Sequence, residues 1–108
     1  MNTPSITVLV ENTVRRRRLL AEHGFSAYIE TEEARVLFDT GAGMALFPNA
    51  RELGIVFENL DAIVCSHGHD DHTASLHAVL HNARSAKVCL HPDALTAKFV
   101  KRAVALGV

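Results

Sequence analysis

The chain has 108 residues, 48% of them apolar and 21% charged, with a formal net charge of −1 at neutral pH. This balance is typical of a folded globular protein, and the length predicts one domain at most, over residues 1–108. The weak net charge argues against nucleic-acid or anionic-membrane partners, and no apolar run approaches the roughly 18 residues of a membrane span. Because the N-terminus lacks the basic-then-apolar layout of a secretory signal, we expect a cytoplasmic protein.

The first half of the chain predicts three strands and one helix. Ser5–Val10 is rich in β-branched residues and predicts the first strand. Phe25–Glu30 and Arg35–Asp39 predict two more strands, joined by a short polar segment in the manner of a hairpin. A helix is predicted over Met44–Leu53, where Pro48 indicates a kink or a second start.

The second half predicts a strand–helix–strand unit followed by another helix. Ala62–Ser66 is short and apolar, as expected of a strand buried on both faces. Thr73–Asn82 carries apolar residues at helical spacing, and Lys87–Leu90 predicts the next strand. A last helix is expected to begin at Pro92. Together these elements predict a right-handed βαβ crossover and an α/β fold.

Three features outside the predicted core leave alternatives open. The run Arg15–Arg18 is either a solvated face or an anion-steering edge near an active site. Glu22 and His23 either lie at the rim of a site or cap a turn. Cys65 and Cys89 occupy strand-like runs, and we expect both to be buried free thiols in a reducing compartment.

The segment IVCSHGHDDHTASL (63–76) carries the strongest functional signal. Its loop offers His67, His69, Asp71 and His72 directly after a predicted buried strand, where open α/β sheets bind ligands. Imidazole and carboxylate ligands suit zinc, iron or manganese, and the absence of thiolates in the loop disfavours a structural zinc site. Because the adjacent Asp71 and His72 must diverge, we expect two neighbouring ions that share and activate a hydroxide. Ser66 is not expected to be a nucleophile, because no elbow motif accompanies it.

This loop resembles the H-x-H-x-D-H motif of the metallo-β-lactamase-fold hydrolases. The segments LLAEHGFSAYIE, VLFDTG, NARELGI and SHGHDDHTASL occur in the order seen in the branch often labelled dihydropterin or ribofuranosylaminobenzene-phosphate synthase-like. The resemblance implies an αββα sandwich, of which this chain would hold about the first half as a mixed sheet plus helices. It also implies a hydrolase that acts on a small-molecule substrate through a metal-bound hydroxide.

The resemblance assigns expected roles to individual residues. His67 and His69 would bind the first of two zinc ions, with iron or manganese as alternatives. Asp71 and His72 would bind the second ion, and Asp71 would also carry a proton in catalysis. Asp39, in the FDTG match, would be a structural carboxylate that orients the metal loop.

The chain departs from this family in its length. Family members supply further ligands downstream, whereas this chain offers only His77, His81 and His91 after the motif. We expect His77 and His81 to be an exposed helical pair, and we disfavour His91 as a ligand because it comes too early. Each ion would then have only two protein ligands, and the sheet would leave an apolar face uncovered.

Two readings of function therefore remain. In the first, the chain is an incomplete N-terminal fragment of a metal-dependent hydrolase, and a missing C-terminal half or a homo-oligomer would complete it. In the second, it is a non-catalytic truncated module that binds metal or another protein.

Overall fold

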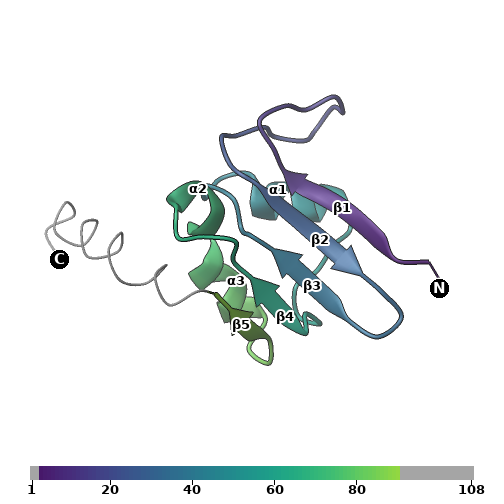
Figure 1. Cartoon of the computed structure of the whole chain (residues 1–108). Coiled ribbons are helices and arrows are strands. Elements are labelled where there is room, and N and C mark those ends of the chain that lie inside the picture. The colour runs from purple at the N-terminus through teal and green to yellow at the C-terminus, as the bar shows by residue number, and fades with distance from the viewer. Residues whose placement is uncertain (1–2, 91–108) are drawn as a thin grey trace, which may run out of the picture.

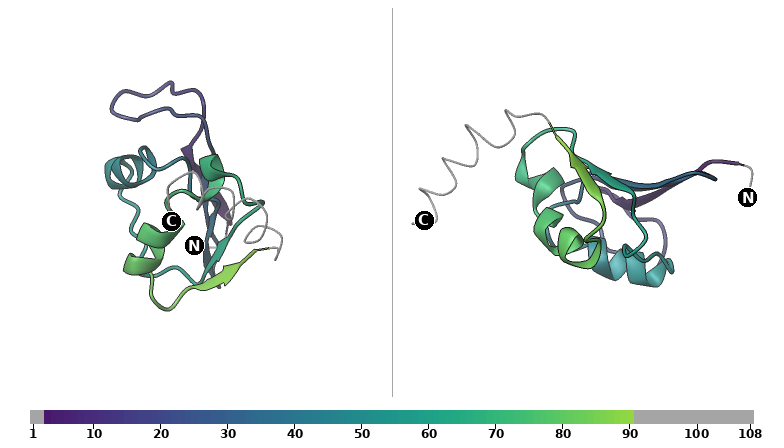
Figure 2. Two further views of the ribbon diagram at one scale, coloured as in Figure 1. Left: turned by 90° about the vertical axis from the view of Figure 1, so that its left-hand side faces the viewer. Right: turned by 90° about the horizontal axis from the view of Figure 1, so that it is seen from below.

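The computed structural model describes residues 3–90, without the side chains of Asp70 and Asp71, so the predicted last helix and His91 lie outside the described residues. Five strands form one mixed sheet, and the helices α1 and α3 cover one of its faces (Figures 1 and 2). The elements are β1 (Ser5–Val10), β2 (Ser26–Glu30), β3 (Arg35–Phe38), α1 (Leu46–Glu52), β4 (Ala62–Val64), α2 (Asp70–Thr73), α3 (Leu76–Asn82) and β5 (Lys87–Cys89). The described helices have seven residues or fewer, and none of them could span a membrane.

The strands pair in their sequence order. β1, β2 and β3 are antiparallel neighbours, and β3, β4 and β5 are parallel neighbours. Helix α1 lies in the connection from β3 to β4, and helices α2 and α3 lie in the connection from β4 to β5. The carboxyl ends of β3 and β4 therefore meet at one edge of the sheet, which is where open α/β sheets bind ligands. This arrangement confirms the predicted hairpin, the parallel unit and the α/β fold class.

The core lies between the sheet and its helices. Leu37 and Ile63 are register partners on β3 and β4, and both side chains are 0% exposed. Leu46 from α1 and Val79 from α3 are equally buried and belong to the same cluster. The helical spacing of apolar residues in the sequence places Leu46 and Val79 on the apolar faces of their helices. The packing of these faces against the sheet follows from that pattern.

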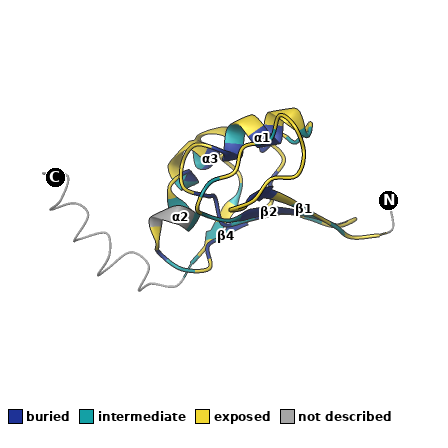
Figure 3. Ribbon diagram, turned by 90° about the horizontal axis from the view of Figure 1, so that it is seen from above, coloured by how far each residue is buried: buried dark blue, intermediate teal, exposed yellow. Residues whose placement is uncertain are grey.

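Among the described residues, no helix covers the opposite face of the sheet (Figure 3). The register places apolar side chains on this face. Side chains alternate between the two faces of a strand, so the neighbours of the inward-facing Leu37 and Ile63 point outward. Ile6 on this face is 69% exposed and Val8 is 46% exposed. The expected uncovered face is therefore present in residues 3–90. By register its members are Ile6, Val8, Ala27, Ile29, Val36, Phe38, Ala62 and Val64.

Several element boundaries differ from the prediction. The predicted helix 73–82 is divided into α2 and α3, with a break at Ala74 and Ser75. Pro48 does not kink α1, because it is the third helical residue, where backbone N–H groups have no partner within the helix. Cys65 is buried as expected, but Cys89 is exposed. That prediction was wrong because Cys89 pairs in register with the outward-facing Val64 and lies on β5, the outermost strand of the described sheet.

Candidate metal centre

Asp39 lies at the base of the site, immediately after β3. Its backbone N–H donates to the carbonyl of Val64 at 2.8 Å, and its own carbonyl accepts a bond of 2.7 Å from the Ser26 hydroxyl. Its φ of 58° ends the predicted strand one residue early. Aspartate tolerates this left-handed conformation better than most residues do, so the local sequence suits the turn. The residue is only 1% exposed.

The Asp39 carboxylate holds two parts of the metal-loop segment. Its Oδ1 accepts the backbone N–H of Ser66 at 2.7 Å, and its Oδ2 accepts the Ser66 hydroxyl at 2.6 Å. Oδ2 also lies 2.7 Å from Nδ1 of His72. These short contacts are typical of hydrogen bonds to an ionised carboxylate. They are the contacts expected of a residue that orients the loop.

This network indicates which nitrogen of each imidazole bears a proton. A carboxylate only accepts hydrogen bonds, so Nδ1 of His72 donates to Asp39. The Ser66 hydroxyl donates its hydrogen bond to Asp39, so its oxygen accepts a hydrogen bond from Nδ1 of His67 at 2.8 Å. The neutral tautomer that fits these contacts carries its proton on Nδ1, and Nε2 is then the nitrogen that can bind a metal.

Backbone bonds clamp the end of the loop to the segment after β3. The Thr40 N–H and hydroxyl both donate to the carbonyl of His72, at 2.6 and 3.1 Å. The N–H of Ala74 donates to the Gly41 carbonyl at 3.2 Å. The DTG sequence thus supports the loop through its backbone as well as through Asp39.

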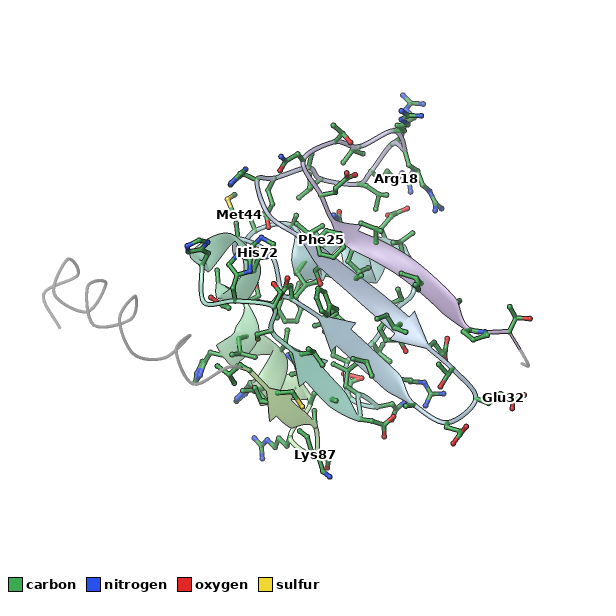
Figure 4. All side chains as sticks on the ribbon, in the orientation of Figure 1. Arg18, Phe25, Glu32, Met44, His72 and Lys87 are labelled. Atoms are coloured by element: carbon green, nitrogen blue, oxygen red, sulfur yellow. The ribbon has the colours of Figure 1, made fainter. Side chains whose placement is uncertain are left out.

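Three of the polar side chains converge. Asp39, His67 and His72 each offer a ligand atom, and these atoms lie within 4.8 Å of one another. The ring centroids of His67 and His72 are 4.2 Å apart, and Figure 4 shows His72 at the edge of the sheet. His69 is exposed and lies outside this group, although its ring centroid is 4.7 Å from that of His67. The Asp71 side chain lies outside the described part of the chain.

Of the described residues, three other candidates, His77, His81 and Cys65, do not belong to this group. His77 and His81 are both exposed on α3, as expected. Burial raises the pKa of the Cys65 thiol from its usual 9.0 to about 11, with the Asp39 and Cys89 charges as further causes. Cys65 is therefore a neutral thiol near pH 7, which makes it a poor metal ligand.

Glu22 and His23 prove to have different surroundings. The Glu22 carboxylate accepts the backbone N–H groups of Ala42, Met44 and Ala45, at 2.8 to 3.2 Å, at the start of α1. A Cβ atom at Gly41 would lie 2.9 Å from the same carboxylate, which explains the glycine. His23 instead lines a cavity of about 190 Å³ together with Phe25 and His72. The sequence offered the EHG match as a signal for both residues but could not separate a capping role from a place at the rim.

Comparisons with known proteins agree with this architecture. Residues 20–101 match the family model of the Metallo-beta-lactamase superfamily. The chain is 40% identical over 95 residues to an uncharacterized protein of Methanocaldococcus jannaschii. It is 34% identical over 86 residues to 7,8-dihydropterin-6-methyl-4-(beta-D-ribofuranosyl)-aminobenzene-5'-phosphate synthase of the same organism.

Solved structures give the same result for the fold. The Rm3 metallo-beta-lactamase matches 65% of this chain with a TM-score of 0.56 and 29% identity. The metallo-beta-lactamase MIM-1 of Novosphingobium pentaromativorans matches 61% with a TM-score of 0.52 and 25% identity. The chain spans only 27% of the Rm3 structure and 25% of the MIM-1 structure. It spans 37% of the uncharacterized relative and 29% of the synthase.

Proposed function

Because the chain belongs to the metallo-β-lactamase superfamily, we propose that it carries part of the metal centre of a metal-dependent hydrolase. The observation that carries this proposal is the convergence of His67 and His72 with the buried Asp39, whose ligand atoms lie within 4.8 Å of one another. Two imidazoles this close together, held by hydrogen bonds to one carboxylate and to Ser66, are a donor set that fits zinc, iron or manganese. We favour zinc.

The ligand roles follow from the family motif. His67 and His69 would hold the first ion, and Asp71 and His72 the second. Asp39 would orient the ligands, because its two oxygens already accept three hydrogen bonds from Ser66 and His72. When bound, such ions lower the pKa of a coordinated water and polarise the bond under attack. Asp71 would carry the proton in that reaction.

Catalysis by this chain would need more polypeptide than it contains. A catalytic zinc commonly has three protein ligands, whereas the motif supplies two for each ion. The uncovered sheet face and the small share of each relative that the chain spans support the same conclusion. Residues 1–108 would therefore be part of a larger domain. A missing C-terminal half or a second copy of the chain would cover the sheet and complete the site.

The substrate is proposed to be a small molecule with a hydrolysable ester, phosphoester or amide bond. The second candidate function is a module that binds metal or another protein without catalysis, which the short ligand set favours. A heteromer that co-purifies with the chain at fixed stoichiometry would support this second function.

Metal content tests the proposal directly. Metal-free protein would be dialysed against zinc and its bound metal measured, for the parent chain and for His67→Ala and Asp71→Ala. His81→Ala is the matched control, because His81 is an exposed imidazole on α3. We expect both loop variants to lose bound zinc and the control to retain it. Unchanged zinc content in both loop variants would overturn the ligand assignment.

Activity separates the two candidate functions. The zinc-loaded chain and a version extended by the downstream sequence of a relative would be assayed with a generic phosphoester and a lactone. Turnover by the extended version that is lost in Asp71→Ala supports the hydrolase. No turnover by either version, with zinc still bound, supports the non-catalytic module.

A further inference from the structure

The loop between β1 and β2, residues 11–25, is held in place at both of its ends (Figure 1). The amide of the buried Asn49, on α1, donates to the carbonyls of Leu9 and Leu20 at 2.7 and 2.9 Å. Its oxygen accepts the Leu20 N–H at 2.8 Å. The N–H of Glu22 donates to the Glu11 carbonyl at 3.1 Å. One buried side chain therefore fixes where the loop leaves β1 and where it returns.

Two half-open cavities, each of about 190 Å³, lie along this loop and share Glu11 as a lining residue. The first is the cavity beside the metal centre, lined by Asn12, His23, Phe25 and His72. The second lies over Asn49 and is lined by Arg15 and Arg16 together with an apolar wall. That wall consists of Val8, Leu9, Val14, Leu19 and Leu20.

The second cavity combines exposed apolar groups with unpaired positive charge. Val14 is 36% exposed and Leu20 is 47% exposed, so this wall is open to solvent. Arg15–Arg18 are all exposed, and in residues 3–90 none of them has an ion pair or a side-chain hydrogen bond. The tip of the loop, which includes Arg18, lies away from His72 (Figure 4).

The arginines and the apolar wall of this cavity suit two different parts of a ligand. Guanidinium groups donate in a fork that matches phosphate or carboxylate oxygens. Exposed valine and leucine side chains gain from covering an apolar group. Of the four arginines, only Arg15 and Arg16 line the cavity, so the charge is placed at its rim and not merely spread along the loop.

We propose that the cavity lined by Arg15 and Arg16 binds a small amphiphilic anion, with a phosphate or carboxylate on the arginines and an apolar portion against Val14 and Leu20. Since Glu11 lines both cavities, the same molecule would extend from the arginines toward the metal centre. This second statement rests on the proposed hydrolase function. It makes the substrate an anionic compound whose charged end lies away from the reacting bond.

The test uses the metal-free full chain, so that it does not depend on the metal centre. Octyl phosphate, octanoate, octanol and inorganic phosphate would be titrated in turn by calorimetry, below the micelle concentration. We expect saturable binding of octyl phosphate or octanoate, at least about tenfold tighter than that of octanol or inorganic phosphate. Equal binding of octanol would overturn the role of the arginines. Equal binding of inorganic phosphate would overturn the role of the apolar wall.

A matched pair of variants separates the site from general charge. Arg15→Gln/Arg16→Gln should weaken octyl phosphate binding about tenfold or more, because it removes the donors at the cavity. Arg17→Gln/Arg18→Gln removes the same net charge outside the cavity and should leave the affinity within about twofold at 0.15 M salt. Equal weakening by both pairs would show general electrostatic attraction and refute the site.

Two further arms keep the alternatives distinct. Co-sedimentation with phosphatidylcholine vesicles containing phosphatidylglycerol tests a lipid surface. Vesicle binding without octyl phosphate binding would replace the small molecule by a membrane. Zinc content of Arg15→Gln/Arg16→Gln should equal that of the parent chain. If His67→Ala loses zinc but binds octyl phosphate as tightly as the parent chain does, the anion site is separate from the metal site. That conclusion would hold whether or not the chain belongs to a hydrolase.

Discussion

Replacing Asp39 with asparagine tests the network beneath the metal loop. The side chain keeps its size, but one of its two oxygens becomes an NH₂ group. Oδ1 faces the Ser66 N–H, and Oδ2 faces the Ser66 hydroxyl and Nδ1 of His72. Whichever way the asparagine amide is oriented, its NH₂ group therefore faces a group that donates a hydrogen bond to Asp39 in the parent chain. A hydrogen bond to a charged group contributes about 1.5–3 kcal/mol, and an unsatisfied buried donor costs about 1–3 kcal/mol. We expect Asp39→Asn to lower the free energy of unfolding by about 2–4 kcal/mol.

Urea unfolding of the metal-free chain, followed by circular dichroism, measures this loss. Asp61→Asn is the control, because Asp61 is exposed and its carboxylate accepts one backbone N–H, that of Arg35, at 2.7 Å. The control should lose less than about 1 kcal/mol. Zinc affinity of Asp39→Asn should fall about 10- to 100-fold, since the tautomers of His67 and His72 are no longer fixed. A stability loss equal to that of the control would refute the reasoning about the network.

Three further predictions concern residues around the site. Asn49→Ala should lower the free energy of unfolding by about 2–4 kcal/mol in a urea titration, because it leaves the buried carbonyl of Leu9 and the part-buried backbone groups of Leu20 without their partner; an unchanged midpoint would contradict this. Glu22→Gln should cost about 1 kcal/mol, because it removes the carboxylate at the start of α1; the same titration checks it, and full stability would be the contrary result. At pH 8 the exposed Cys89 should react with iodoacetamide in the folded chain while Cys65 does not, as peptide mass spectrometry would show. Equal alkylation of both thiols would contradict the burial of Cys65. The Cys65 pKa is raised from 9.0 to about 11, so its contribution to stability is present below about pH 9 and is lost as the pH rises toward 11.

The fold was predictable wherever the sequence pattern is local. A run rich in β-branched residues indicated β1, and the helical spacing of apolar residues indicated α3. The pattern could not show where each element stops. β3 stops because Asp39 turns into a left-handed conformation to reach the next loop, and that turn depends on a partner 27 residues away, Ser66. The exposure of Cys89 likewise depends on which face of β5 it occupies, which the sequence of this three-residue strand does not disclose.

The site was predictable as a set of residue types but not as a network. The loop motif indicated four ligands, His67, His69, Asp71 and His72, and the described group contains only the first and the last of them. The FDTG match indicated Asp39 as the orienting carboxylate. Nothing in the sequence indicated that Ser66 links Asp39 to His67 through hydrogen bonds, because a serine before a histidine motif has many roles. The two cavities along the β1–β2 loop were equally hidden, since Asn49 shapes that loop from another element.

We propose above all that imidazoles of the loop after β4, at the sheet edge where β3 also ends, hold the metal. X-ray absorption at the zinc edge of the zinc-loaded chain tests it most directly. We expect nitrogen or oxygen ligands at about 2.0–2.1 Å with the scattering pattern of at least two imidazoles. That pattern should vanish in His67→Ala/His72→Ala and persist in His77→Ala/His81→Ala. A zinc–sulfur distance of about 2.3 Å, or an imidazole pattern that survives the loop substitutions, would contradict the account.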